Sequence, residues 1–383
     1  MQNPRSIVVS WADDLEALAS RRDEWNALVA RGETRTVFQT YEWHLAWWHA
    51  FGSGSQPLVL LAEENGVLLG IAPLVLSSRR VLGRKRRVVE FMGARAADYG
   101  DLVVDSQHPE ASLALVHWLL EHRELWDLLM LANITHDATV NQLCEVSERF
   151  RLPHTVRTLC KSPSHRCTDR DVTALALHDK KLCRARRQFE RQGQVSIESY
   201  ATSSDIAAHL PDFFQQHSRR RAMTDAPSTY HDPRWRAFLY ELAQALGPRK
   251  QMVLLATCLD GKPVAFNLCF ELCNRLVAYN GCFDPDLAKH SPGSLGLWFL
   301  IQYVLEQDID ELDLGRGEEP YKRRFTNHVR VSREVRVYHS RLSRRIDCLL
   351  LRVIAWLENS PTTGSLTRRL LWRVQDRRWG RTG

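Results

Sequence analysis

Two stretches of the chain have the hydrophobic pattern of β-hairpins. Apolar residues rich in Val and Leu run over 57–77, with Asn-Gly at 65–66, and over 251–271, with Asp-Gly at 260–261. Asn-Gly and Asp-Gly tolerate the positive φ angles that a two-residue hairpin turn requires. We therefore predict one β-hairpin in each half of the chain.

The same order of elements surrounds each hairpin. Helical periodicity precedes it, and a meander strand, an apolar helix and a further strand follow it. The predicted helices are 13–31, 42–51, 109–122, 204–221, 233–246 and 293–307, and the predicted strands beyond the hairpins are 126–132, 275–282 and 309–314. The repeat predicts an α/β fold of the layered α+β kind, with tandem domains whose mixed β-sheets are flanked by helices.

Length and charge divide the chain further. Its 383 residues exceed what one core usually supports. We predict an N-terminal domain over 1–170, a basic linker helix over 171–194, a C-terminal and catalytic domain over 195–340, and a basic helical tail over 341–383. The tail holds ten Arg against three acidic residues and so carries the whole formal charge of +7.

This charge distribution bears on partners and compartment. A neutral body argues against a specific nucleic-acid interface, whereas the tail is expected to contact a membrane surface or a partner protein. Nine scattered cysteines and an N-terminus that soon turns acidic favour a cytoplasmic protein, with membrane association as an alternative. Cys160, His165 and Cys167 lack the paired spacing of zinc modules, so no metal is expected.

The most informative segment is 291–325. It predicts a Pro-Gly turn that opens an apolar helix, a short strand, and a Gly-Arg-Gly loop followed by Tyr-Lys. Amides at such a helix start can hold a phosphate group. The pattern resembles the C-terminal signature of a GNAT acyltransferase branch that includes polysaccharide-associated acetyltransferases and is related to Fem-type transferases. The residues that carry this resemblance are Ser291, Pro292, Gly293, Asp313, Gly317, Glu318, Tyr321 and Lys322.

The resemblance implies a cofactor site in one of two tandem domains, with acetyl-CoA or another acyl-CoA as co-substrate. Its diphosphate would lie on the amides of Gly293, Ser294, Leu295 and Gly296, although Leu295 stands where the superfamily usually has a small residue. The alternative is an ordinary helix start. Asn280 and Gly281 would end a splayed strand, where the Gly281 amide supports the oxyanion. The alternative is that Asn-Gly simply closes that strand.

The resemblance also suggests residues for proton transfer and acceptor binding. Tyr321 would protonate the leaving thiolate, and Glu318, ranked above Asp313, would accept the proton of the nucleophile. His217 is a second candidate base, with Arg221 one helical turn away on the acceptor side. Structural alternatives are packing for Tyr321 and His217, loop fixation for Asp313, and an ion pair for Lys322. Substrate contacts are expected from Lys322, Arg221, Asp98 and Tyr99.

The sequence therefore predicts an acyltransferase that moves an acyl group, acetyl by preference, from acyl-CoA to an amine or hydroxyl of a sugar, glycan precursor or similar polar acceptor. An acyl carrier protein is a further donor to consider. Two alternatives stay open: a Fem-type transferase that uses aminoacyl-tRNA, and a non-catalytic binding protein that retains the fold.

Overall fold

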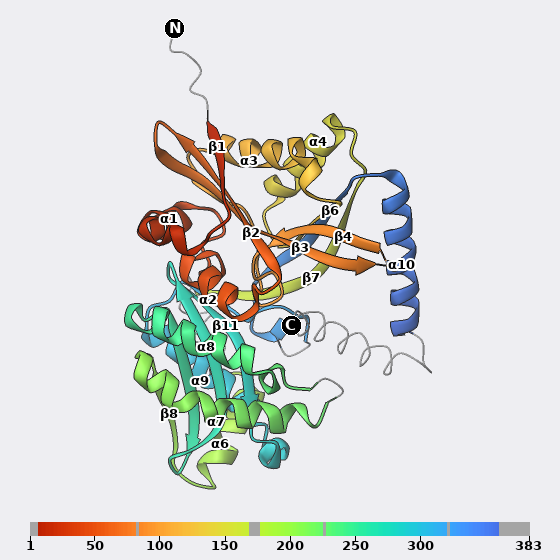
Figure 1. Ribbon diagram of the computed structural model, residues 1–383. Coiled ribbons are helices and arrows are strands. Elements are labelled where there is room, and N and C mark those ends of the chain that lie inside the picture. The colour runs from red at the N-terminus through yellow and green to blue at the C-terminus, as the bar shows by residue number, and fades with distance from the viewer. Residues whose placement is uncertain (1–6, 82–83, 168–176, 225–226, 320–321, 360–383) are drawn as a thin grey trace. The chain divides into compact units, whose positions relative to one another are not determined.

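The chain forms two compact units. The computed structural model describes residues 7–81, 84–167, 177–224, 227–319 and 322–359. The first unit comprises Met1–Leu159 and Val331–Gly383, and the second comprises Cys160–Arg330. Each unit is a mixed sheet with helices packed against it, as Figure 1 shows. The predicted α/β layered fold is confirmed.

The first unit has the sheet order β1-β2-β3-β4-β6-β13. All neighbouring strands are antiparallel except β4 and β6, which are parallel. Its strands are β1 (Val8–Ala12), β2 (Ser55–Glu64), β3 (Val67–Val81), β4 (Arg84–Phe91), β5 (Val103–Val104), β6 (Leu128–Ile134) and β13 (His328–Tyr338). Its helices are α1 (Arg22–Arg31), α2 (Tyr41–Phe51), α3 (Glu110–Glu121), α4 (Asp137–Arg149) and α10 (Arg341–Asn359).

The second unit repeats this plan. Its sheet order is β8-β9-β10-β11-β12-β7, and again only the fourth pair, β11 with β12, is parallel. Its strands are β7 (His154–Arg166), β8 (Val195–Tyr200), β9 (Met252–Leu259), β10 (Lys262–Leu272), β11 (Arg275–Phe283) and β12 (Glu311–Asp313). Its helices are α6 (Lys180–Glu190), α7 (Ser203–Arg221), α8 (Pro233–Leu246) and α9 (Pro292–Glu306).

The last strand of each sheet comes from a distant part of the chain. In the first unit, β13 pairs with β6, with Val337 opposite Leu129. In the second unit, β7 pairs with β12, with His165 opposite Leu312. Thus β7, which follows β6 in the chain, completes the sheet of the second unit. In turn β13, which follows β12 in the chain, completes the sheet of the first unit.

The two predicted hairpins are confirmed and owe their register to their turns. Asn65 and Gly66 have φ of 51° and 79°, and Asp260 and Gly261 have φ of 50° and 74°. Positive φ at both central residues is the type I′ geometry, whose twist matches that of paired strands. This register turns alternate side chains of β10 to opposite faces: Phe266 contacts Phe213 of α7, and Asn267 donates a hydrogen bond to the Gly296 carbonyl of α9.

The basic helix α6 belongs to the second unit. Asp179 caps it by accepting hydrogen bonds from the amides of Lys181 and Leu182. Leu182 and Phe189 are fully buried in the same core as the apolar side of α9. The basic side of this helix is therefore only one of its sides, and the other side packs into the second unit.

Candidate active site

The short strand β12 pairs with only the first three residues of β11, which continues beyond it to Phe283. They pair from Arg275 with Glu311 to Val277 with Asp313, and no described strand pairs with that edge of β11 beyond Val277. The chain after Asp313 instead stays with β7: the amides of Leu314 and Gly317 donate to the carbonyls of Pro163 and Lys161 at 3.1 and 3.0 Å. Beyond Val277, therefore, this edge of β11 has no strand partner among the described residues, and its main-chain groups are not part of a ladder there.

A β-bulge lies just beyond Val277. On the side that still pairs with β10, Cys269 is opposite Ala278 and Leu268 is opposite Asn280, so Tyr279 is the extra residue. A bulge bends a strand and increases its local twist. Asn280 and Gly281 do not close the strand, because both pair with β10 and β11 continues to Phe283; the irregularity lies one residue before Asn280. The corresponding strands of the first unit, β3 and β4, pair without a register shift.

Helix α9 begins beyond the end of β11. Ser291 adopts a left-handed conformation with φ of 61°, and Pro292 is the first helical residue, where its missing N–H costs nothing. Gly293 is exposed, and a Cβ at that position would lie 3.4 Å from the Phe283 ring. Leu295 is fully buried in the core. The exposed first turn is therefore at Gly293 and Ser294, with Leu295 anchoring the helix.

On the face of the sheet covered by α7, a short turn contributes a buried polar group. Tyr230, 2% exposed, lies on the turn Thr229–His231, and its hydroxyl accepts a hydrogen bond of 2.9 Å from the Asn280 amide of β11. Its ring packs against Phe213 and Phe214. Burial raises the pKa of Tyr230, so the phenol stays protonated and holds Asn280 in place.

His217 lies beside Tyr230 on α7. Its ring is 4.8 Å from the Tyr230 ring, and its Nδ1 lies 2.7 Å from the Ser228 hydroxyl. Burial, with Arg221 and His231 nearby, lowers the pKa of His217 to about 4. The imidazole is therefore neutral near pH 7. Arg221, at the C-terminus of the same helix, is exposed.

A neighbouring cysteine has no nucleophilic character. Burial raises the pKa of Cys282, whose thiol contacts the Gln216 Oε1 at 3.4 Å. A protonated, buried thiol is a small apolar side chain rather than a reactive one.

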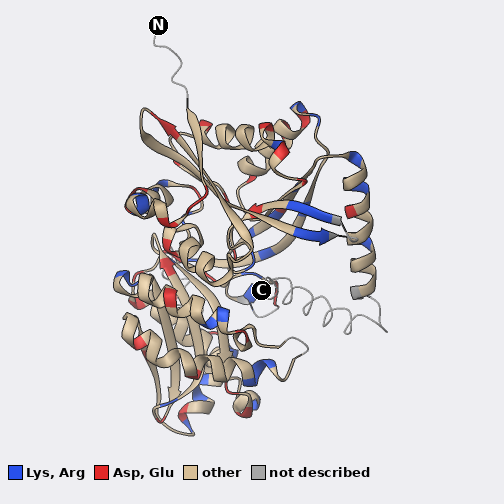
Figure 2. Cartoon of the chain, in the orientation of Figure 1, with Lys and Arg blue, Asp and Glu red and all other residues tan. Residues whose placement is uncertain are grey.

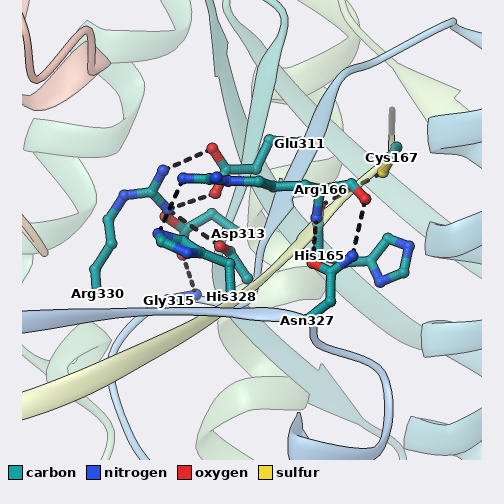
Figure 3. A network of polar contacts seen from close by, with 10 residues as sticks. His165, Arg166, Cys167, Glu311, Asp313, Gly315, Asn327, His328 and Arg330 are labelled. Atoms are coloured by element: carbon teal, nitrogen blue, oxygen red, sulfur yellow. Dashed lines mark hydrogen bonds and ion pairs between the residues drawn. The ribbon is translucent and has the colours of Figure 1, made fainter. Parts of the chain in front are cut away.

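Asp313 closes the strand end and belongs to an ion-pair network. Its Oδ1 accepts a 2.9 Å hydrogen bond from the Gly315 amide, and its Oδ2 lies 3.4 Å from Arg330. Figure 3 shows that the Arg330 guanidinium contacts both Asp313 and Glu311. Its two terminal nitrogens, Nη1 and Nη2, each donate to one carboxylate oxygen of Glu311. Burial opposes ionisation of Glu311, but Arg330 lowers its pKa overall. Asp313 is fully buried, so the geometry fits loop fixation.

The Gly-Arg-Gly loop is held by a buried lysine. Lys322 is 5% exposed, and its Nζ donates to the Arg316 carbonyl at 2.8 Å and pairs with Glu319 at 2.9 Å. The structural ion pair expected for Lys322 is thus present, with Glu319 rather than Asp313 or Glu318. Glu318 is exposed and pairs with Lys161 and Arg323. Tyr321 lies outside the described residues.

Two predicted substrate contacts are in the first unit. Tyr99 is 1% exposed and packs 6.0 Å from the Phe38 ring, and Asp98 beside it is half-buried. Among the described residues, no three His, Cys, Asp or Glu side chains gather where they could hold a metal ion. None of the described helices combines the length and the apolar composition needed to cross a membrane.

Sequence reasoning missed three residues of this region. Tyr230 lies in a short turn without hydrophobic periodicity, and its contact with Asn280 joins residues that are far apart in the chain. Arg330 is one of many arginines in the sequence, and no local pattern distinguishes it from the others. Asn267 carried a usable signal, because a lone amide within an apolar strand is buried only when it has hydrogen-bond partners.

Comparison with known proteins identifies the class of the second unit. Residues 178–323 match the family model described as "Acetyltransferase (GNAT) domain". The match lies entirely within the second unit and includes the parted strands and α9. This part of the second unit is therefore similar to GNAT acetyltransferase domains. No curated protein matches the sequence.

Solved structures support the same fold across both units. The crystal structure of FemX matches with a TM-score of 0.60 and 10% identity, over 82% of this chain and 95% of FemX. The C-terminal DUF2156 domain of an Agrobacterium fabrum protein gives 0.54 and 12%, over 88% and 96%. A conserved protein of unknown function from Bacteroides thetaiotaomicron gives 0.55 and 11%, over 86% and 100%. At 10–12% identity, this likeness shows the fold alone.

Proposed function

We propose that the second unit transfers an acyl group, acetyl by first choice, from acyl-CoA to an amine or hydroxyl of a sugar, glycan precursor or similar polar acceptor. The observation that carries this proposal is the parting of β11 and β12 beside the bulge at Tyr279. It leaves one edge of β11 open to a thioester, at the strand end that leads to α9. The first unit lacks the equivalent bulge, which favours a single site.

The donor is held at two places in this proposal. The Gly293 amide and the positive end of the helix dipole at the first turn of α9 bind the diphosphate of coenzyme A, while the amides of Ser294 and Leu295 donate to the Ser291 carbonyl at 2.9 and 3.3 Å. The pantetheine arm then extends between the parted strands. The amide of Gly281 stabilises the oxyanion, and the bond between Tyr230 and Asn280 keeps this part of β11 in position.

The chemistry is a direct displacement. The nucleophile attacks the thioester carbonyl, the carbon–sulfur bond breaks, and the thiolate leaves with a proton from Tyr321. Glu318 accepts the proton of the nucleophile, since it is an exposed carboxylate of the loop, whereas Glu319 pairs with Lys322 and Asp313 is fully buried and bonded to Gly315. His217 packs against the Tyr230 ring and is only 3% exposed, so it is less accessible to an acceptor than Glu318.

Calorimetry and turnover test this assignment. Acetyl-CoA and longer acyl-CoAs should bind saturably to the full-length protein. Gly293→Ala adds only an ordinary contact with Phe283, so it should fold normally but weaken acyl-CoA binding about tenfold, because its methyl group crowds the first turn. Ser204→Ala, in the first turn of α7, is the matched control.

Tyr321→Phe should lower kcat at least tenfold with little change in acyl-CoA affinity. Tyr240→Phe, a tyrosine of α8 that packs on Phe214, is its control. Unchanged turnover would remove Tyr321 from the mechanism, and an absence of binding by every acyl-CoA would refute the donor.

A second candidate is a Fem-type transferase that uses aminoacyl-tRNA. The fold likeness to FemX and the exposed cations of α6 favour it. Charged tRNA that donates its aminoacyl group, together with no binding of acyl-CoA, would replace the first proposal with this one. If neither donor binds, the fold serves as a non-catalytic binding module.

A further inference from the structure

Helix α10 presents two different faces. One face attaches it to the first unit: Asp347 accepts a hydrogen bond of 2.6 Å from Arg336 and one of 2.8 Å from the Tyr338 hydroxyl, both on β13. Burial and the Asp347 carboxylate both raise the pKa of Tyr338 to about 12, so its hydroxyl remains a donor. The helix, blue in Figure 1, is therefore fixed by its polar side.

The other face of α10 is apolar and exposed. Leu342, Leu349, Val353 and Trp356 are 66%, 62%, 45% and 71% exposed. Their spacing of seven, four and three residues places them in one stripe along the helix. Several large apolar side chains exposed side by side on a folded surface indicate a site of interaction, whereas single exposed apolar residues do not.

Arginines line one edge of this stripe. Arg345 lies four residues before Leu349, and Arg352 lies four residues before Trp356, so each is one turn from an exposed apolar side chain. Both are exposed. A helix with Leu and Trp on one face and arginine beside it has the composition of helices that lie in the interface of a bilayer.

A second basic element lies at the same end of the sheet as the start of α10. Val88, Leu128 and Tyr338 are opposite one another on β4, β6 and β13. Residues before Val88 and after Tyr338 therefore project from the same end. There the β3–β4 hairpin carries the exposed Arg80 and Lys85, and Figure 2 shows the run of basic residues on these strands.

We propose that α10 and the end of the β3–β4 hairpin bind an anionic lipid surface. The apolar stripe enters the boundary between headgroups and acyl chains, while Arg345, Arg352, Arg80 and Lys85 contact anionic headgroups. The complementary charge on two elements favours a lipid surface over a second copy of this chain, which would bring like charges together. This inference is independent of the proposed acyl transfer.

Vesicle co-sedimentation of the full-length protein tests the proposal. Binding should be at least tenfold stronger to vesicles of phosphatidylcholine with phosphatidylglycerol than to phosphatidylcholine alone, and it should weaken as salt rises. Leu349→Asp with Trp356→Asp should weaken binding to the anionic vesicles at least tenfold. The far-UV circular dichroism and melting temperature should stay those of the wild type, because both side chains are exposed.

Two double variants that remove the same number of positive charges distinguish an effect of this surface from an effect of the net charge of the protein. Arg345→Gln with Arg352→Gln should weaken vesicle binding about tenfold, whereas Arg35→Gln with Arg95→Gln, two exposed arginines of the first unit away from that end of its sheet, should not. The proposal is overturned if the wild type does not bind anionic vesicles, or if the Leu349 and Trp356 variant binds like the wild type. It is also overturned if both arginine pairs weaken binding equally, or if the variants change only the oligomeric state in sedimentation velocity.

Discussion

At the scale of single residues, the candidate site depends on buried hydrogen bonds more than on ion pairs. The Tyr230 hydroxyl fixes Asn280 next to the bulge, and no charged group takes part in that bond. Tyr230→Phe keeps the packed ring but leaves the Asn280 amide without its acceptor. We expect a loss of about 1 kcal/mol in unfolding free energy and a larger fractional loss in turnover.

Urea unfolding and steady-state kinetics of Tyr230→Phe check this, with Tyr240→Phe as control because Tyr240 also packs on Phe214. Wild-type turnover in the Tyr230 variant would show that the position of Asn280 does not matter for the reaction.

His217 makes stability depend on pH. Its pKa is about 4 in the folded protein, mainly because burial disfavours the charged ring, against about 6.5 in an unfolded chain. Between these values the unfolded chain binds a proton that the folded protein does not. Stability should therefore fall as pH falls from about 6.5 to about 4, by up to about 3 kcal/mol from this group.

His217→Gln should show a shallower fall over that range in urea unfolding, since glutamine has no such titration. His339→Gln, at an exposed histidine, should keep the wild-type slope. Equal slopes in both variants would mean that another group causes the acid sensitivity.

At the scale of elements, local signals predicted what local physics determines. The turns at 65–66 and 260–261 were predicted because two residues define the hairpin geometry. The helices that became α8 and α9 were predicted because caps and periodicity lie within one segment. The bounds of β7 and β13 were not predicted, because the pairing of each depends on a strand far away in the chain. Helix α4 was not predicted either. The parting of β11 and β12 was implied by family resemblance rather than by any local pattern.

The packing of α6 gives a prediction at this scale. Phe189→Ala removes a fully buried ring from the core that α6 shares with α9. We expect it to destabilise the second unit by about 3–5 kcal/mol. Lys181→Ala, at an exposed position of the same helix, should change stability little. Thermal unfolding of both variants measures the difference, and equal melting temperatures would mean that α6 is not part of that core.

At the scale of the whole molecule, the two units should respond differently to a donor. Acyl-CoA at about a hundred times its Kd should stabilise the unit that binds it by about 2.7 kcal/mol. Hydrogen exchange should therefore slow within Cys160–Arg330, around β11 and α9, and stay unchanged within residues 7–159. Protection that appears in the first unit instead would place the donor site there.

The exchange of last strands has a consequence for biosynthesis. Translation completes β6 long before it reaches β13, about two hundred residues later, which at typical elongation rates is about ten seconds or more. During that interval the nascent first unit has an open sheet edge where β13 will dock, and an open edge invites pairing with other chains. In the second unit, by contrast, the strand at the end of the sheet, β7, is synthesised before the first described helix, α6. A growing polypeptide of this design should finish its later domain before its earlier one.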